Sequence, residues 1–292
     1  MNYTIKNGDI SFTVSTLGAE LISAKNQNGD EFIWQANPDF WGEHAPLLFP
    51  VCGRLKNFYY TYEGKRYDMG IHGFLRRLEF DVVAVSDTEI TLCVSQNEET
   101  LKQYPFNFTV TVSYKAENCK LLSSYIIKND NDTVMPFAFG LHPGFNVFTD
   151  GGITVNDYKV IFDKSCVLHR TKLSEYPNGP AFLPHELEGG ILKIDNEAIA
   201  AVDTIVLKNV GTHSRLICEK SSHEIEMRFS ENLPLYCIWK DPSMDAHYLC
   251  LEPWTTEPAR YVEEEHLTTR ENMIHLAPRA SEHFFCDFTF KR

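Results

Sequence analysis

The sequence lacks the motifs by which nucleotide-binding, acyl-hydrolase and many metal-binding domains are found. It contains no Gly-x-Gly-x-x-Gly, Walker or Gly-x-Ser-x-Gly segment. It also has no His-x-His or His-x-x-x-His pair, so no single element presents two imidazole ligands to a metal. We therefore expect neither a cofactor nor a bound metal.

Long apolar runs and an excess of positive charge are missing as well. No apolar stretch approaches the roughly 20 residues that a helix needs to cross a bilayer. The chain has 27 basic and 40 acidic residues, which gives a formal net charge of −13. Such a surface repels nucleic-acid phosphates and anionic lipid headgroups, so we expect no partner of either kind.

The eight cysteines include no Cys-x-x-Cys pair. A chain of this size does not need disulfides for stability, and its first residues enter strand-like sequence directly, without a signal peptide. We expect reduced, mostly buried cysteines and a cytoplasmic protein, either a monomer or a homodimer.

Helical periodicity is scarce, and alternation of apolar and polar residues with period two dominates. Short helices are expected only at 98–104 and 262–267. Strands are expected at 10–14, 80–85, 90–94, 108–114, 121–127, 215–218, 225–229 and 283–290. Many short strands joined by hairpins predict an all-β fold, a large antiparallel β-sandwich with few short helices. We expect a single domain over residues 1–292, with the Pro- and Gly-containing stretch 163–200 packed on the sandwich as a long excursion.

Two segments place a basic side chain among glycines. Arg54 follows Phe49-Pro50-Val51-Cys52-Gly53, and His72 lies within Gly70-Ile71-His72-Gly73. The Arg54 guanidinium could be a donor fork for sugar hydroxyls or the partner of a surface carboxylate. His72 could approach a ligand or could be satisfied within a turn.

Two further segments place a titratable side chain at the end of an apolar strand. His142 precedes Pro143 and Gly144, and Phe145 offers a ring beside it; Glu252 precedes Pro253 and Trp254. A histidine at such an opening suits a proton donor, and a carboxylate near apolar surface suits a base. We expect Glu252 to be ionised and His142 protonated in the free protein. A buried structural histidine and an edge-strand salt bridge are the alternatives.

These segments together resemble the aldose 1-epimerase (galactose mutarotase-like) family, in particular its LacX-like bacterial branch. The similarity rests on Phe-Pro-x-x-Gly-Arg at 49–54, His-Gly-Phe-x-Arg at 72–76, Gly-Leu-His-Pro-Gly-Phe at 140–145 and Leu-Glu-Pro-Trp at 251–254. The motifs occur in the family's order over nearly the whole chain. The resemblance implies a large sandwich with a sugar-binding site on one sheet face.

The resemblance also implies a role for each site residue. Glu252 would be the catalytic base and His142 the acid, while Arg54, His72 and Asp203 would bind substrate. Phe145 and Trp254 would supply aromatic surface to the sugar. The implied reaction is cofactor-independent exchange of the α and β anomers of a free aldose. A non-catalytic sugar-binding or sensor protein, a hexose-6-phosphate mutarotase, and a lyase or hydrolase remain as alternatives.

Overall fold

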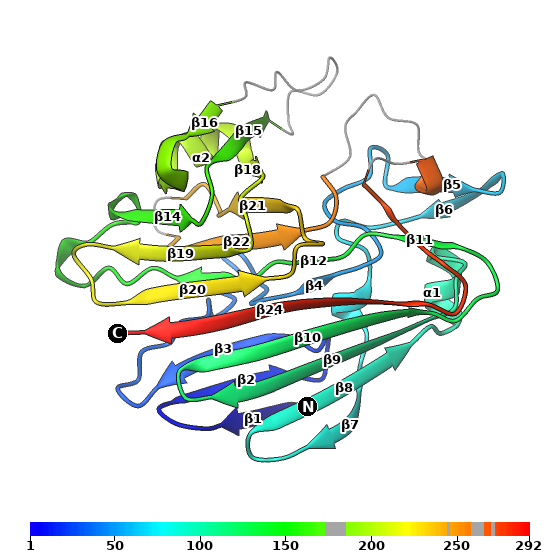
Figure 1. The fold of residues 1–292 in the computed structure, drawn as a ribbon, viewed down its shortest axis with the longest axis horizontal. Helices are drawn as coiled ribbons and strands as arrows, with labels where there is room; N and C mark the ends of the chain where they lie inside the picture. The colour runs from blue at the N-terminus through cyan, green and yellow to red at the C-terminus, as the bar shows by residue number, and fades with distance from the viewer. Residues whose placement is uncertain (173–184, 244–245, 258–265, 270–271) are drawn as a thin grey trace.

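The computed structural model describes residues 1–292 except 173–184, 244–245, 258–265 and 270–271. It confirms a mainly antiparallel β fold with few short helices (Figure 1). Among the described residues, nine strands form the larger sheet. In spatial order they are β17 (Ile191–Lys193), β14 (Tyr158–Phe162), β19 (His213–Cys218), β20 (Glu224–Phe229), β24 (Ser281–Lys291), β10 (Lys120–Asn129), β9 (Phe108–Glu117), β8 (Glu89–Ser95) and β7 (Asp81–Val85).

The second sheet has eight strands in the described part of the chain. In spatial order they are β16 (His185–Leu187), β15 (Cys166–Lys172), β18 (Asp203–Lys208), β21 (Leu235–Trp239), β22 (Tyr248–Trp254), β12 (Gly140–Leu141) and β4 (Leu47–Leu48), with β13 (Gly144–Asn146) also paired to β22. Strand β22 is buried along its whole length because it lies in the middle of this sheet.

Smaller sheets and short helices complete the described structure. The sheets are β1 (Asn2–Lys6) with β2 (Ile10–Ser15) and β3 (Leu21–Asn26), β5 (Tyr59–Tyr62) with β6 (Lys65–Asp68), and β11 (Met135–Phe137) with β23 (Ile274–Leu276). The helices are α1 (Glu98–Gln103), α2 (Asn196–Val202), and the 3-10 turns η1 (Leu75–Arg77), η2 (Asp150–Gly152), η3 (Val155–Asp157), η5 (Glu188–Gly190) and η6 (Leu267–Thr269). No helix in the described residues is long and apolar enough to cross a membrane.

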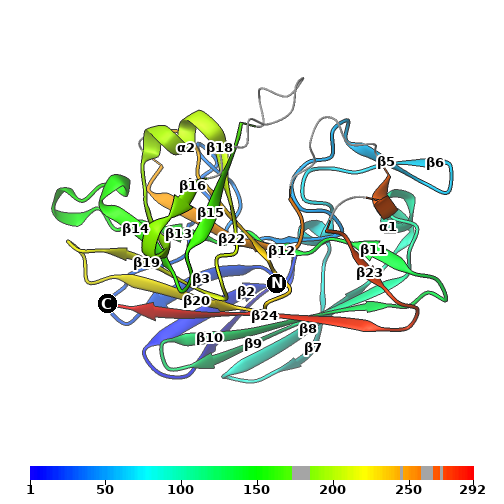
Figure 2. The ribbon, with the colours of Figure 1, turned by 45° about the horizontal axis from the view of Figure 1, so that its top comes forward.

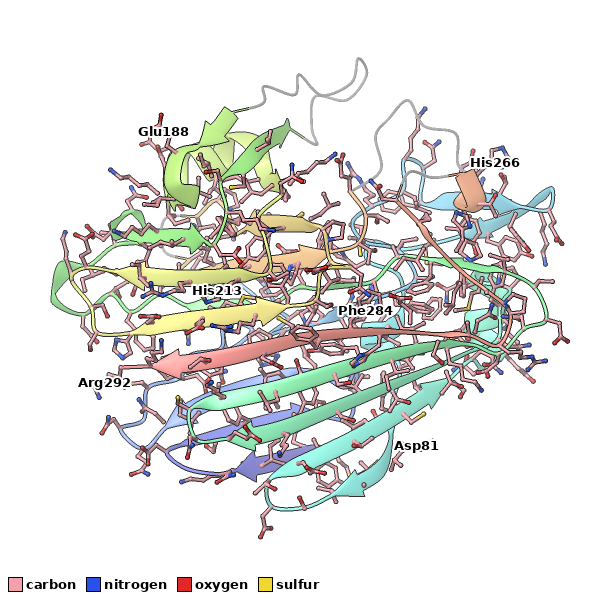
Figure 3. All side chains as sticks on the ribbon, in the orientation of Figure 1. Asp81, Glu188, His213, His266, Phe284 and Arg292 are labelled. Atoms are coloured by element: carbon pink, nitrogen blue, oxygen red, sulfur yellow. The ribbon has the colours of Figure 1, made fainter. Side chains whose placement is uncertain are left out.

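Alternation along the strands builds the core, as the sequence predicts. Every second residue of β9 is buried, and β10 alternates in the same way. Buried residues of the two strands lie opposite each other, as Val112 and Tyr125 do. The buried faces join one apolar cluster that runs from Ile5 to Phe290. Figure 3 shows these side chains filling the space beside the strands, including Phe284 of β24. Consequently, most charged side chains of the nine-stranded sheet lie on its other face.

The prediction of a long excursion over residues 163–200 is wrong for the described part of that stretch. Strands β15 and β16 belong to the eight-stranded sheet, β17 forms an edge of the nine-stranded sheet, and α2 follows. Strands β16 and β17 have three residues each and lie at sheet edges, so they need little alternation and the sequence pattern does not show them. Residues 262–265 of the second expected helix lie outside the described residues, and η6 begins at Leu267.

Figure 2 shows how this arrangement frames one part of the eight-stranded sheet. Strands β15, β16 and β18 with α2 stand to one side, and the β5–β6 hairpin stands to the other. Strands β22 and β12 run between them. The residues that the sequence singles out come from these central strands and the loops next to them.

Candidate active site

The centre of the candidate site is built by β22 and by the residue that follows β12. Gly140 of β12 pairs with Trp254 of β22, which brings His142 next to Glu252. Leu249 and Leu251 point into the main core, while Tyr248 and Cys250 belong to a second, aromatic cluster. Period-two alternation therefore places Glu252 on the face of the sheet opposite the main core.

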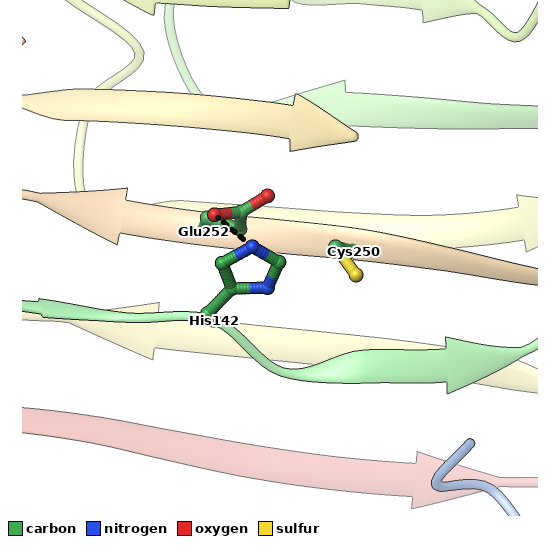
Figure 4. Close-up of side chains that lie close together, drawn as sticks. All are labelled: His142, Cys250 and Glu252. Atoms are coloured by element: carbon green, nitrogen blue, oxygen red, sulfur yellow. Dashed lines mark ion pairs between the residues drawn. The ribbon is translucent and has the colours of Figure 1, made fainter. Parts of the chain in front are cut away.

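His142 and Glu252 form a close pair away from solvent. Nε2 of His142 lies 3.2 Å from Oε2 of Glu252, and the two side chains are 8% and 1% exposed. Figure 4 shows the imidazole and the carboxyl group facing each other from neighbouring segments. Neither carboxyl oxygen has a hydrogen bond of good geometry to a described residue, and neither does Nδ1 of His142. Buried polar atoms without partners are rare in folded proteins and mark places where a ligand can supply the missing bonds.

Burial decides the charge of this pair. It raises the pKa of the Glu252 carboxyl well above its ordinary value. It also lowers the pKa of His142 to about 3, an effect that the nearby Arg76 reinforces. Both charged forms are disfavoured because both groups lie in the same apolar surroundings. Both directions run against the expectation of an ionised Glu252 and a protonated His142 in the free protein, since burial favours the neutral form of each group.

A third potential metal ligand lies beside the pair. One donor atom from each of His142, Cys250 and Glu252 lies within 4.8 Å of the others. Burial, followed by the electrostatic effect of the neighbouring Glu252 carboxyl group, raises the pKa of the Cys250 thiol well above its ordinary value. Since cysteine binds metals as the thiolate, a metal ion held by these three donors would require deprotonation of Cys250.

His72 is held beside His142 by an unusual piece of backbone. Its φ is +60°, and Gly73 follows with φ +68°. A Cβ on Gly73 would lie 2.1 Å from the carbonyl oxygen of Phe49, so only glycine fits there. Gly53 donates its N–H to Nδ1 of His72 over 3.0 Å and accepts the N–H of His72 over 2.8 Å.

These bonds settle which nitrogen of His72 can meet a ligand. Burial, then His142 and Arg76, lowers the pKa of His72 well below its usual range, so the ring is neutral. Because Nδ1 accepts a backbone hydrogen bond, the single proton lies on Nε2. The imidazole of His72 lies edge-on to that of His142, with centroids 5.2 Å apart. His72 thus offers one N–H donor next to the His142–Glu252 pair.

The other predicted residues occupy different positions around the pair. Arg54 is half-buried and directly follows Gly53, the backbone partner of His72. The Trp254 ring lies 5.5 Å from that of His72 and is 3% exposed, so it supports the histidines from within the sheet. Asp203 begins β18, opposite Lys172 of β15; its side chain lies outside the described part of the structure.

The expectation that Phe145 presents its ring to a ligand is corrected. Phe145 is fully buried in the main core, where its ring centroid lies 6.0 Å from that of Phe288 and 6.4 Å from that of Phe290. Alternation along β13 explains the difference: Gly144 faces the site, so the next residue faces the core.

His142 is flanked by two tryptophans that were not predicted as site residues. The Trp41 ring lies 4.9 Å from the His142 ring, and the Trp239 ring lies 5.8 Å from it. Both tryptophans are only partly buried. The aromatic pair Phe40-Trp41 before Gly42 was the available signal for the first, but a loop has no periodicity that assigns a face. Trp239 follows from the pairing of β21 with β22, which the sequence alone does not show.

The glycines on either side of His142 each make room for a tryptophan ring. A Cβ on Gly140 would lie 2.6 Å from Cδ1 of Trp254, and a Cβ on Gly144 would lie 2.6 Å from Cζ3 of Trp41. The Gly-Leu-His-Pro-Gly motif is therefore a packing requirement of the aromatic rings around the imidazole.

Fold and site together define a class: a large antiparallel β-sandwich with a buried imidazole–carboxyl pair on one sheet face. The family model for aldose 1-epimerase matches residues 1–284, and the chain belongs to this family. It is 29% identical over 269 residues to the chromosomal LacX protein of Lactococcus lactis, covering 87% of this chain and 88% of that one.

Solved structures agree with this assignment. A galactose mutarotase related enzyme from Lactobacillus acidophilus has a TM-score of 0.91 and 32% identity, covering 100% of this chain and 98% of that one. A galactose mutarotase-like protein from Lactobacillus casei has a TM-score of 0.91 and 27% identity, covering 99% of this chain and all of the other. The expected family and fold are thus confirmed.

Proposed function

We propose that this chain is an aldose 1-epimerase that interconverts the α and β anomers of a free sugar. The observation that carries the proposal is the buried His142–Glu252 pair, with its 3.2 Å separation and its unpartnered carboxyl oxygens. A sugar supplies hydroxyl donors to such oxygens, and its ring oxygen can accept a proton. No cofactor is needed for this reaction, and a monomer or a homodimer would suffice.

The proposed mechanism uses the one proton that the pair shares. When sugar hydroxyls hydrogen-bond to the carboxyl group, its charged form is stabilised and the proton moves from Oε2 of Glu252 to Nε2 of His142. Glu252 then removes the proton of the C1 hydroxyl while His142 protonates the ring oxygen. The C1–O5 bond breaks and an aldehyde forms. Rotation about C1–C2 and the reverse transfers close the ring on the other face.

The surroundings favour a neutral sugar over a sugar phosphate. Arg76, the arginine of the His-Gly-Phe-x-Arg motif, is mostly buried, and its Nε lies 3.0 Å from Oε1 of Glu43. That carboxylate offsets the charge which a phosphate would require. We therefore infer that free aldoses are turned over faster than their 6-phosphates. All eight cysteines are free of disulfides, which supports a cytoplasmic location.

Anomer exchange measured by NMR or polarimetry on freshly dissolved α-aldoses tests the proposal. We expect the wild-type protein to accelerate exchange, and Glu252→Gln and His142→Asn each to lower kcat by about 10²–10⁴-fold, the usual size of an acid–base contribution. Glu89→Gln, at an exposed position of β8, is the control for loss of a carboxylate. If Glu252→Gln exchanged anomers as fast as wild type, the assignment of the base would be wrong. Sugar binding without acceleration in the wild type would instead identify a binding protein.

A further inference from the structure

The His142 ring is oriented by packing rather than by a second hydrogen bond. Histidines that transfer protons are commonly held by a hydrogen bond to the ring nitrogen that does not react. Here Nδ1 is buried and has no such partner among the described residues. What fixes the plane of the imidazole must therefore be the rings around it.

Trp41 is the ring that lies against the face of the imidazole. Its plane is tilted by 31° from that of His142, with centroids 4.9 Å apart. Trp239 meets the imidazole at 70° and His72 meets it at 87°, so both lie edge-on. Only a ring that covers the face of the His142 imidazole can restrict tilting of the imidazole and keep water from that face.

Trp41 is itself firmly placed. It also stacks with Tyr248, with centroids 5.7 Å apart and planes 17° apart. The backbone carbonyl oxygen of Trp41 accepts the indole N–H of Trp34 over 2.7 Å. The backbone N–H of Trp41 donates to the carbonyl oxygen of Asn37 over 2.9 Å. The absent Cβ of Gly144 leaves space for the far edge of the indole. Movement of the ring away from His142 is therefore opposed by contacts along the aromatic cluster.

The loop that carries Trp41, residues 37–46, is tied to the segment that carries His142. The carbonyl of His44 accepts the N–H of Gly144 over 2.8 Å, and that of Pro46 accepts the N–H of His142 over 3.1 Å. Oε1 of Glu20 accepts the N–H groups of His44 and Ala45, each over 2.8 Å. Backbone hydrogen bonds thus join the loop directly to the segment that carries the imidazole.

We propose that Trp41 is a positioning residue for His142, which holds the imidazole plane so that Nε2 stays aimed at Glu252. The proposal rests on the function proposed above, since its catalytic readout needs anomer exchange. The ring also shields His142 from water, which adds to the burial that keeps the imidazole neutral in the free protein. Trp41 acts through His142 and does not itself exchange a proton.

The test compares Trp41→Ala and Trp41→Phe with Phe40→Ala, a matched loss of a neighbouring ring from the same loop. Phe40 packs on Trp34, 6.2 Å between centroids, and belongs to none of the ring contacts of His142. We expect Trp41→Ala to lower kcat by about 10–100-fold, the size of effect known for small misplacements of a reacting group. KM should stay within about threefold. Trp41→Phe should restore most of kcat, and Phe40→Ala should leave it near wild type.

A second measurement separates positioning from substrate contact. In Trp41→Ala the imidazole of His142, followed by NMR in the absence of sugar, should titrate closer to its ordinary pKa because water reaches the ring. A raised KM with unchanged kcat and unchanged titration would overturn the proposal and make Trp41 a sugar platform. Unchanged kcat, KM and titration would also overturn it.

The same measurement keeps the two proposals distinguishable. If wild type accelerated no anomer exchange, the proposed function would fail, while the titration of His142 would still decide whether Trp41 controls the imidazole. If Trp41→Ala did not fold, Trp41→Leu would replace it, since leucine keeps apolar bulk without a planar face. The expected loss of kcat and shift in titration are the same.

Discussion

At the scale of single residues, Glu252 is a carboxyl group kept where a carboxylate is unfavourable. It is 1% exposed and its oxygens have no hydrogen-bond donor of good geometry among the described residues. A group held in this way lowers the stability of the empty protein at neutral pH, and substrate relieves the cost. Such a cost is typical of sites that are built to bind a reacting group.

The first prediction concerns how the effect of Glu252 on the free energy of unfolding depends on pH. Because the folded-state pKa of Glu252 is raised above 4.5, its contribution to stability is fully present below about pH 4.5 and is lost as the pH rises toward the folded value. Glu252→Gln removes that loss. The melting temperature of the variant relative to wild type should rise as the pH increases above about 4.5, the ordinary pKa of the carboxyl group. Differential scanning fluorimetry at matched ionic strength measures it.

His142 acts in the opposite direction and is common to both proteins. Its folded-state pKa is depressed to about 3, so its contribution is present above its ordinary value of 6.5 and is lost as the pH falls toward 3. The contribution of His142 should therefore largely cancel when the melting temperatures of wild type and Glu252→Gln are compared. A margin that stays constant, or narrows with rising pH, would show that the carboxyl group of Glu252 is not held protonated.

The second prediction concerns Gly144. In Gly144→Ala the new Cβ would lie 2.6 Å from the Trp41 ring and 3.2 Å from Cβ of Trp34, so one of them must move. We expect a loss of about 1–3 kcal/mol in stability, as for other overpacked sites, and a lower kcat because Trp41 is displaced.

Gly42 offers a matched control in the same loop. A Cβ there meets nothing within 4 Å, so Gly42→Ala should change the free energy of unfolding by less than about 0.5 kcal/mol. Urea unfolding and anomer exchange on both variants decide the matter. Equal effects at the two positions would mean that the contact with Trp41 is unimportant.

At this scale the sequence predicts which residues lie near one another where glycine or proline flanks a titratable side chain. His142, His72 and Glu252 were found by their glycine and proline neighbours, and the structure brings them together. Phe145 was misplaced because the sequence does not say which face of a three-residue strand meets the core. Trp41 was missed because a loop has no period from which a facing direction can be derived.

At the scale of elements, the loop 37–46 depends on Glu20, which lies between β2 and β3. Its carboxylate accepts two backbone N–H groups of the loop and is 18% exposed. The third prediction is that Glu20→Ala costs about 1.5–3 kcal/mol, the usual range for hydrogen bonds to a charged group. The loop would loosen and kcat would fall with it.

Urea unfolding curves and anomer exchange measure both effects, and Glu89→Ala, at an exposed position of β8, is the control. Lowered stability with unchanged kcat would show that the loop keeps Trp41 in place without Glu20.

The hairpins β7–β8 and β9–β10 were predictable because adjacent antiparallel strands alternate over several residues. Strands β15 to β17 were not, since none of them pairs with a strand that a tight turn connects to it.

At the scale of the whole molecule, one apolar cluster connects both large sheets. All four tryptophans, at positions 34, 41, 239 and 254, lie around the candidate site. The fourth prediction is that the chain unfolds as one unit, as expected for a single domain. Tryptophan fluorescence, which reports the site, and far-ultraviolet circular dichroism, which reports both sheets, should give coincident urea transitions. Separate midpoints would divide the chain into two folding units.

The net charge of the chain bears on how a ligand approaches from solution. The formal net charge is −13, but a free aldose carries no net charge on which the field of the protein could act. Association with a free aldose should therefore be nearly independent of ionic strength. A sugar phosphate would meet the repulsion of the whole protein, which salt screens over about 8 Å at physiological strength. Its association would speed up as salt is added, so the salt dependence of the association rate distinguishes the two kinds of ligand.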